Sequence, residues 1–147
     1  MKIVNHKATF DYQILDRYEA GVELLGLEVK SLRAGHAKLE GSFVKLIGGG
    51  AFLVNAQIFP YLYARPEKYD PKRTRRLLLH KKELISLRSK IDGANLTLIP
   101  LSWYNKGSHI KLEVGLARGK KQYEKRDKMR KAAEIRDLER GFRGKIK

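Results

Sequence analysis

The segment 95-NLTLIPLSWYNKGSHIKLEVGLA-117 carries the clearest fold signal in this chain. In its second half, large apolar residues at positions 110, 112, 114 and 116 alternate with lysine, glutamate, glycine and alanine. A period of two is typical of a β-strand that is buried on one face. Residues 95–104 are the expected antiparallel neighbour, because Asn105-Lys106-Gly107-Ser108 can turn the chain back. The segment therefore predicts a β-hairpin.

Glycine-marked turns and short apolar runs predict further strands before this hairpin. Gly48-Gly49-Gly50 separates strands expected at 42–47 and 51–59, because glycine adopts positive φ without steric cost. Two more strands are expected at 9–15 and 21–27, on either side of a charged turn at 16–19. Helices are expected over 28–34, ending at Gly35, and over 81–91, which has leucine and isoleucine along one face.

These elements predict a mainly β fold over residues 1–117. About six strands are accompanied by two or three short helices, without the alternation of strand and helix that indicates a parallel sheet. A closed antiparallel barrel would pair the edges of all of these strands. The domain expected at 1–117 is therefore a barrel.

Charge indicates the kind of partner. Lysine and arginine number 32 against 16 acids, which gives a formal net charge of +16 and a pI of about 10.1. Such a balance is typical of nucleic-acid binding. The chain has no cysteine, which excludes disulfides and thiol catalysis. The sequence has no apolar run long enough to span a membrane and no signal-peptide pattern. We therefore expect a cytoplasmic protein without membrane contact.

The last thirty residues form a separate basic tail, 118–147. They hold thirteen of the basic residues against five acids and contain few large apolar side chains. Burial of so little apolar surface does not offset the entropy of ordering the backbone. Acids four positions before lysines, such as Glu124 before Lys128, favour a helix once a partner is present. The tail is expected to be disordered alone and helical when bound to something large and negatively charged.

Enzymatic chemistry is weakly indicated. The four histidines lie far apart in the sequence and form no metal-binding pair, so neither a metal nor another cofactor is expected. Glu19, Glu23 and Glu28 could come close in space, but their expected role is that of solvated partners of nearby lysine and arginine. No general acid and base can be paired from the sequence. We therefore expect a protein that is not an enzyme.

A dense basic cluster precedes a strongly apolar run. Lys72, Arg73, Arg75 and Arg76 lie directly before Leu77-Leu78-Leu79, which predicts a phosphate-binding edge attached to the core. Aromatic residues in the body could stack on unpaired bases; they are Tyr61, Tyr63, Tyr69, Trp103 and Tyr104. Packing inside the barrel is the preferred role for Trp103, but not for Tyr63 or Tyr69.

Five ordered blocks of sequence resemble the SsrA-binding protein family, also called small protein B. They extend over nearly the whole chain: Asn5-His6-Lys7-Ala8 with Asp11-Tyr12 and Tyr18-Glu19-Ala20-Gly21; Glu28-Val29-Lys30-Ser31-Leu32-Arg33-Ala34-Gly35; Gly41-Ser42-Phe43; Asp70-Pro71-Lys72-Arg73-Thr74-Arg75-Arg76-Leu77-Leu78-Leu79-His80; and Leu116-Ala117-Arg118-Gly119-Lys120-Lys121-Gln122-Tyr123-Glu124-Lys125-Arg126. One block would be suggestive, whereas five in order are specific.

The resemblance implies an RNA-binding adaptor of ribosome rescue by trans-translation. It implies a barrel of the oligonucleotide-binding (OB) type that binds the tRNA-like domain of transfer-messenger RNA and delivers that RNA to the A site of a stalled ribosome. The tail would then enter the vacant mRNA channel and contact chiefly small-subunit RNA. Elongation factor Tu is a further expected partner through the shared RNA, and the protein is expected to be monomeric.

The resemblance also implies which residues contact RNA. Matching family positions and the basic clusters give the expected RNA-binding set, which is Asn5, Lys7, Glu19, Lys30, Arg33, Lys72, Arg73, Arg75, Arg76, His80 and Lys111. Glu19 cannot hold a phosphate, so its expected role is to orient a basic side chain or to accept a hydrogen bond from a base or ribose.

The expected decoding-centre and channel residues of the tail are Gly119, Lys120, Lys121, Tyr123, Glu124, Lys125, Arg126, Lys128, Arg130 and Lys131. Glu124-Lys125-Arg126 stands where the family commonly has Asp-Lys-Arg, and Tyr123 occupies an aromatic or histidine position. Both changes keep the charge and the stacking capacity.

Two other functions compete with this one. A general module for single-stranded or structured RNA would use the same barrel with the tail as a nonspecific basic arm. A hydrolase acting on RNA would need an acid and base pair that the sequence does not indicate.

Overall fold

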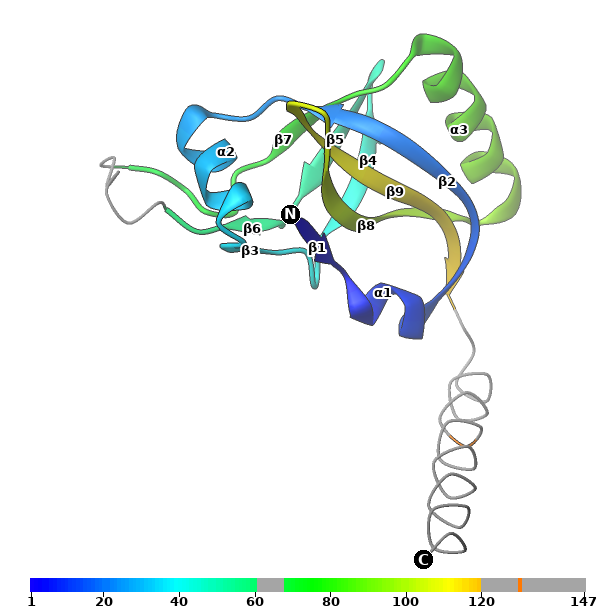
Figure 1. Ribbon diagram of the computed structural model, residues 1–147. Helices are drawn as coiled ribbons and strands as arrows, with labels where there is room; N and C mark the ends of the chain where they lie inside the picture. The colour runs from blue at the N-terminus through cyan, green and yellow to red at the C-terminus, as the bar shows by residue number, and fades with distance from the viewer. Residues whose placement is uncertain (61–67, 120–129, 131–147) are drawn as a thin grey trace, which may run out of the picture.

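The computed structural model describes residues 1–60, 68–119 and 130 (Figure 1). In chain order its elements are β1 (Lys2–Val4), α1 (His6–Asp11), β2 (Tyr12–Val22), α2 (Gly26–Arg33), β3 (Ala37–Lys38), β4 (Phe43–Ile47), β5 (Gly50–Val54), β6 (Gln57–Ile58), β7 (Arg75–Leu78), α3 (Lys81–Ala94), β8 (Thr97–Lys106) and β9 (His109–Gly119). The expected mainly β fold is confirmed.

Within the described residues, six strands hydrogen-bond to one another in a closed ring. The order is β2, β9, β8, β4, β5, β7 and back to β2, and every pairing is antiparallel. Strand β1 lies against β8, and the short strands β3 and β6 form a separate pair. The ring leaves few strand edges unpaired, as we expected from the many short strands predicted from the sequence.

The hairpin at 95–117 is confirmed as β8 and β9. These strands pair over nearly their full lengths and turn at Gly107, which has φ 61°. Pro100 lies in β8 where the register shifts, so the missing N–H of proline falls at an irregular position of the ladder. The glycine turn between β4 and β5 is also confirmed, with Gly48 at φ 58°.

The prediction of two strands at 9–15 and 21–27 was wrong. One strand, β2, runs from 12 to 22 through the supposed turn, and Thr9 belongs to α1. The charged side chains of Asp16, Arg17 and Glu19 are all exposed, and a register shift between Ile14 and Asp16 adjusts the strand to β9. Charged residues that point outward from a strand were thus mistaken for a loop.

The two expected helices are present with shifted ends. Helix α2 starts at Gly26, earlier than expected, and the chain leaves it through Gly35 at φ 78°. Helix α3 extends to Ala94 and ends at Asn95, which adopts φ 52°. The strand expected over 51–59 is divided into β5 and β6 by Asn55, at φ 66°.

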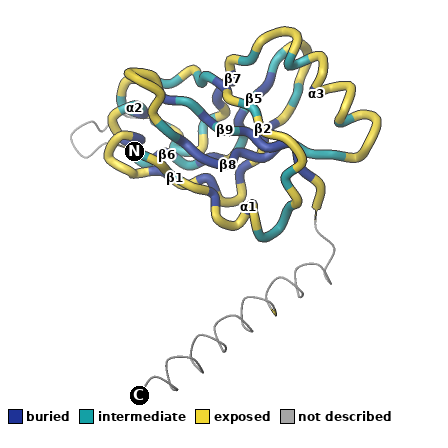
Figure 2. The backbone as a smooth tube through the Cα atoms, turned by 45° about the vertical axis from the view of Figure 1, so that its right-hand side comes forward, coloured by how far each residue is buried: buried dark blue, intermediate teal, exposed yellow. Residues whose placement is uncertain are grey.

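The core lies inside the ring of strands. Figure 2 shows the buried segments concentrated in the central strands, whereas α3 and the loops are largely exposed. Trp103 is fully buried among apolar side chains, which confirms its expected packing role. A smaller cluster joins Ala8 of α1 to Ile99, Leu101 and Ala117 on β8 and β9. Helix α1 therefore packs on the ring beside the end of β9, where the tail begins.

Candidate nucleic-acid interface

Strand β7 separates the basic cluster at 72–76 into buried and exposed residues. Successive side chains of a strand point to opposite faces. Arg75 and Leu77 are therefore buried, whereas Arg76 and Leu78 are exposed. Of the four cations expected to form one phosphate-binding edge, Lys72 and Arg76 are exposed, Arg73 is partly exposed and Arg75 is inside the protein.

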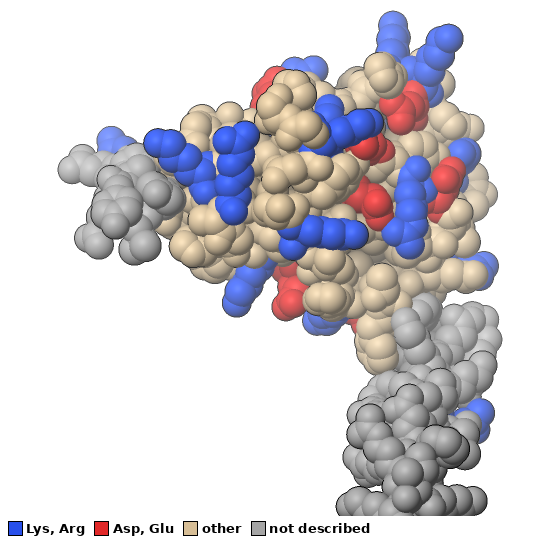
Figure 3. All heavy atoms as spheres, in the orientation of Figure 1, with Lys and Arg blue, Asp and Glu red and all other residues tan. Residues whose placement is uncertain are grey.

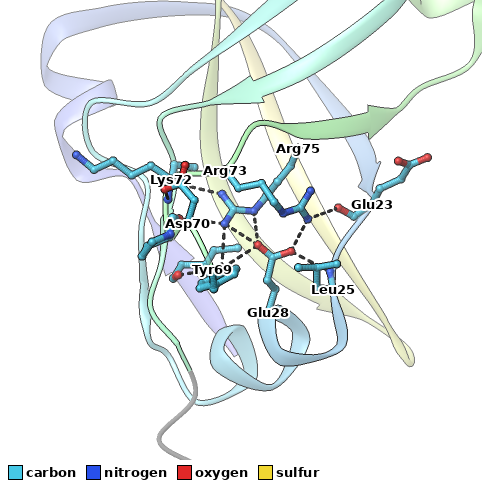
Figure 4. A network of polar contacts seen from close by, with 11 residues as sticks. Glu23, Leu25, Glu28, Tyr69, Asp70, Lys72, Arg73 and Arg75 are labelled. Carbon is cyan, nitrogen blue, oxygen red and sulfur yellow. Dashed lines mark hydrogen bonds and ion pairs between the residues drawn. The ribbon is translucent and has the colours of Figure 1, made fainter. Parts of the chain in front are cut away.

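The placement of Arg75 corrects its expected contact with RNA. Its Nε and Nη2 lie 2.7 and 2.6 Å from Oε2 of Glu28, which α2 carries and which is also fully buried (Figure 4). Its Nη1 donates to the Ala56 carbonyl at 2.8 Å, and Nη2 donates to the Pro71 carbonyl at 3.0 Å. A guanidinium with these acceptors and no exposed surface has no donor to offer a phosphate.

Glu28 was likewise expected to be solvated, and that expectation was wrong. Its Oε1 accepts from Arg73 Nη2 at 2.5 Å and from the Leu25 backbone N–H at 2.9 Å (Figure 4). Burial acts to raise the pKa of Glu28, but the hydrogen bonds from Arg73, Leu25 and Arg75 outweigh burial and hold the pKa below its usual value. Glu28 is therefore a buried carboxylate that stays ionised.

Tyr69 belongs to the same network and was not expected to pack. Its hydroxyl lies 2.9 Å from Glu28 Oε2 and 3.1 Å from the Ile58 carbonyl oxygen. Burial, followed by the nearby Glu28 carboxylate, raises the pKa of this hydroxyl. The ring is only partly exposed and the hydroxyl is occupied, so Tyr69 is a structural residue in this arrangement.

The outer surface of β7, β2, β9 and β8 carries the exposed cations Arg76 and Lys106 and the half-buried Lys111 on paired strands. We call this surface the strand face, and the members used below are Glu19, Gly21, Arg76, Leu78, Tyr104, Lys106 and Lys111. The ion pair of Arg17 with Glu113, 2.6 Å apart, lies on the same face. A Cβ added to Gly21 would lie 3.2 Å from Leu78 Cβ and 3.6 Å from Lys111 Nζ. Lys111 therefore reaches across the bare backbone of Gly21 toward β7, and Leu78 is exposed beside it.

Glu19 lies at the centre of this strand face. Its Oε2 accepts from the Tyr104 hydroxyl at 2.5 Å, and its Oε1 lies 3.0 Å from Lys106 Nζ. The hydrogen bond from Tyr104, then that from Lys106, lowers the pKa of Glu19. Burial and the Glu19 carboxylate raise the pKa of Tyr104 in turn. The expectation that Glu19 orients a basic side chain agrees with its contact to Lys106.

Asn5 and Lys7 lie at another part of the surface. Both line an open hollow between α1 and the start of β4. Asn5 is buried, and its Nδ2 donates to the Pro100 carbonyl at 2.9 Å while its Oδ1 has no partner within the described residues. Lys7 is exposed on α1. The amide of Asn5 thus links the start of the chain to β8. Lys7 is the residue of this pair that places a charged group at the surface.

The remaining expected residues of the body are exposed. Lys30 and Arg33 lie on α2, Lys72 lies before β7, and His80 precedes α3. Arg33 Nη2 donates to the Ser108 carbonyl at 3.2 Å, which links α2 to the turn between β8 and β9. Figure 3 shows lysine and arginine side chains scattered over the face in view, with fewer carboxylates among them.

Sequence reasoning missed Lys106 and Leu78 as members of the strand face. Lys106 stood in the predicted turn, and residues 103–106 show no apolar alternation that could have placed it on a strand. Of the expected tail residues, Gly119 ends β9 and Arg130 is exposed. The others, Lys120, Lys121, Tyr123, Glu124, Lys125, Arg126, Lys128 and Lys131, lie outside the described residues, as do Tyr61 and Tyr63.

Comparison with known proteins places the chain in a family. Residues 2–144 match the family model described as SmpB protein. The chain belongs to the SmpB family. An SsrA-binding protein of Chlorobaculum tepidum is 50% identical over 93% of this chain and 88% of the relative. One of a Sulfurihydrogenibium species is 48% identical over 97% and 94%.

A solved structure supports the same placement of this SmpB-family chain. It is described as "tmRNA-SmpB: a journey to the center of the bacterial ribosome", and one of its chains is 47% identical with a TM-score of 0.68. The match covers 82% of this chain and 85% of that one. Within the part of the present chain that the structure describes, no helix combines the length and apolarity needed to cross a membrane. No group of three or more metal-ligating side chains gathers in that part either.

Proposed function

We propose that this chain is the RNA-binding adaptor of ribosome rescue by trans-translation, and that it binds the tRNA-like domain of transfer-messenger RNA. The observation that carries the proposal is the strand face, where Arg76, Lys106 and Lys111 project from paired strands of a chain that belongs to the SmpB family. Cations on strands present their charges at fixed spacings, which suits a folded RNA whose phosphates are also fixed.

The strand face supplies more than charge. Glu19 holds Lys106 on one side and Tyr104 on the other, so the ammonium group is held in place before RNA arrives. Preorganised donors lose less side-chain entropy on binding. Exposed Leu78 adds an apolar surface beside Lys111 that can contact a ribose or base. These features favour recognition of a shaped RNA surface over uniform attraction to any polyanion.

The two-part organisation completes the proposal. Residues 1–117 form the RNA-binding domain, and the closed ring of six strands supports its assignment to the OB-type barrels. The tail at 118–147 starts with the last two residues of β9 and enters the vacant mRNA channel of the stalled ribosome, where its cations contact small-subunit RNA. The protein acts in the cytoplasm as a monomer, performs no catalysis, and meets elongation factor Tu through the shared RNA.

Truncation after Arg118 tests this division of labour. The shortened chain is expected to bind a transcript of the tRNA-like domain within about twofold of the full chain, because the strand face is intact. Peptide tagging on stalled ribosomes in a reconstituted reaction is expected to be lost. The matched control is the full chain with Arg76 replaced by Gln, which should weaken RNA binding and leave tagging measurable at saturating protein. A truncated chain that tags at the normal rate would contradict the proposal.

A further inference from the structure

The network around Glu28 joins parts of the chain that are distant in sequence. Arg75 donates to the carbonyls of Ala56 and Pro71, and the Ile58 N–H donates to Pro71 at 3.0 Å. The Tyr69 hydroxyl lies within 3.1 Å of the Ile58 carbonyl oxygen. The two ends of the connection between β6 and β7 are thus held together, and Glu28 on α2 supplies the charge that makes burial of Arg75 possible.

Arg73 is the member of this network that reaches the surface. Its Nη2 donates to Glu28 Oε1 and, at 3.3 Å, to the Glu23 carbonyl (Figure 4). Its side chain is 31% exposed, and among the described residues Nη2 alone of its guanidinium nitrogens has a protein acceptor. Nε is buried without a partner among the described residues, so Nη1 is the guanidinium nitrogen that remains for an acceptor from outside the protein.

We propose that Glu28 is a positioning residue for RNA binding: it neutralises Arg75 inside the protein and holds Arg73 so that Nη1 of Arg73 meets an RNA phosphate. The inference rests on the proposed function, because it assumes that the edge carrying Lys72, Arg73 and Arg76 contacts the RNA. Glu28 itself touches no RNA, since its side chain has no exposed surface. An acid buried beneath a basic edge thereby increases affinity for a polyanion.

The test is a double-mutant cycle between Glu28→Gln and Arg73→Gln in the full chain, with a transcript of the tRNA-like domain as the probe. Each single variant is expected to weaken binding about three- to tenfold and to reduce the slope of log affinity against log salt by about one phosphate contact, roughly 0.7 to 0.9. In the Arg73→Gln background, adding Glu28→Gln is expected to weaken RNA affinity by less than about a further twofold, because the Arg73 side chain that Glu28 positions is already absent.

The salt slope separates positioning from loss of folded protein. A smaller folded fraction lowers the amount of RNA bound at saturation but leaves the slope of the remaining molecules unchanged. Tyr69→Phe provides a milder variant, since it removes one hydroxyl and leaves both charges. It is expected to change affinity and slope in the same direction by a smaller amount. Arg76→Gln is the matched control, and its effect should add fully to that of Glu28→Gln.

The outcomes also separate this inference from the function on which it rests. If Glu28→Gln and Tyr69→Phe both bind RNA with the affinity and the salt slope of the wild type, the positioning role is overturned while RNA binding stands. Full additivity of Glu28→Gln with Arg73→Gln would overturn it as well. A wild-type chain that does not bind the transcript would instead refute the proposed function.

Discussion

Glu28 and Glu19 have the same kinds of partner and opposite surroundings. Each carboxylate accepts from a tyrosine hydroxyl and is paired with a basic side chain, Arg75 for Glu28 and Lys106 for Glu19. Glu28 and Arg75 have no exposed side-chain surface, whereas Glu19 and Lys106 are 37% and 65% exposed. Arginine can satisfy several buried acceptors with one planar group, and lysine keeps its ammonium in water. Residue type alone therefore does not distinguish a buried framework from a binding surface.

The largest expected effect is on stability, in a matched pair of substitutions. Glu28→Gln leaves the Arg75 charge buried without its counter-charge, and breaking a buried pair in this way costs about 3 to 5 kcal/mol. Glu19→Gln removes an exposed carboxylate and should leave the urea midpoint close to that of the wild type. Equilibrium urea denaturation measures both variants. Equal losses in the two would show that the burial difference has no energetic consequence.

For RNA affinity, in contrast to stability, substitutions in the strand face around Glu19 should have a larger effect than substitution of the buried Glu28. Replacing both Lys106 and Lys111 by Gln is expected to weaken binding of the tRNA-like transcript about tenfold and to lower the salt slope by about 1.4 to 1.8, which corresponds to two phosphate contacts. Lys45→Gln on β4 is the control, since that exposed lysine lies outside the strand face. Filter binding across a salt series gives both quantities. If Lys45→Gln lowers the salt slope as much as the strand-face substitutions do, the RNA binds elsewhere.

The smallest expected effect is the pH dependence of the stability that Glu28 contributes at the buried site. Because the folded-state pKa of Glu28 is depressed, its ionised form contributes stability above the unfolded value of about 4.5 and loses that contribution as pH falls through the folded pKa. The stability gap between wild type and Glu28→Gln should therefore narrow below about pH 4.5. Urea midpoints measured from pH 7 to pH 3 provide the comparison. A gap that widens on acidification would mean that the pKa of Glu28 is raised instead.

Local patterns predicted the hairpin of β8 and β9, because alternation and turn chemistry act within a few residues. They failed at β2, where outward charges resembled a turn and the shift near Leu15 broke the alternation. They also failed at Arg75, whose inward direction depends on Glu28, 47 positions away in sequence. Nothing near Arg75 in the sequence distinguishes it from Arg76. Which of the basic residues belong to the binding surface could therefore be determined only from the fold, whereas the family could be predicted from the ordered motifs.

Competition for the full chain between the tRNA-like transcript and an unstructured RNA of equal length tests the central claim most directly. At fixed salt, the strand face is expected to bind the folded transcript at least about tenfold more tightly, because its cations are held at spacings that only a folded backbone matches. Lys106→Gln/Lys111→Gln should remove most of that preference. Equal affinity of the wild type for the two RNAs would contradict the account and favour a general RNA-binding module.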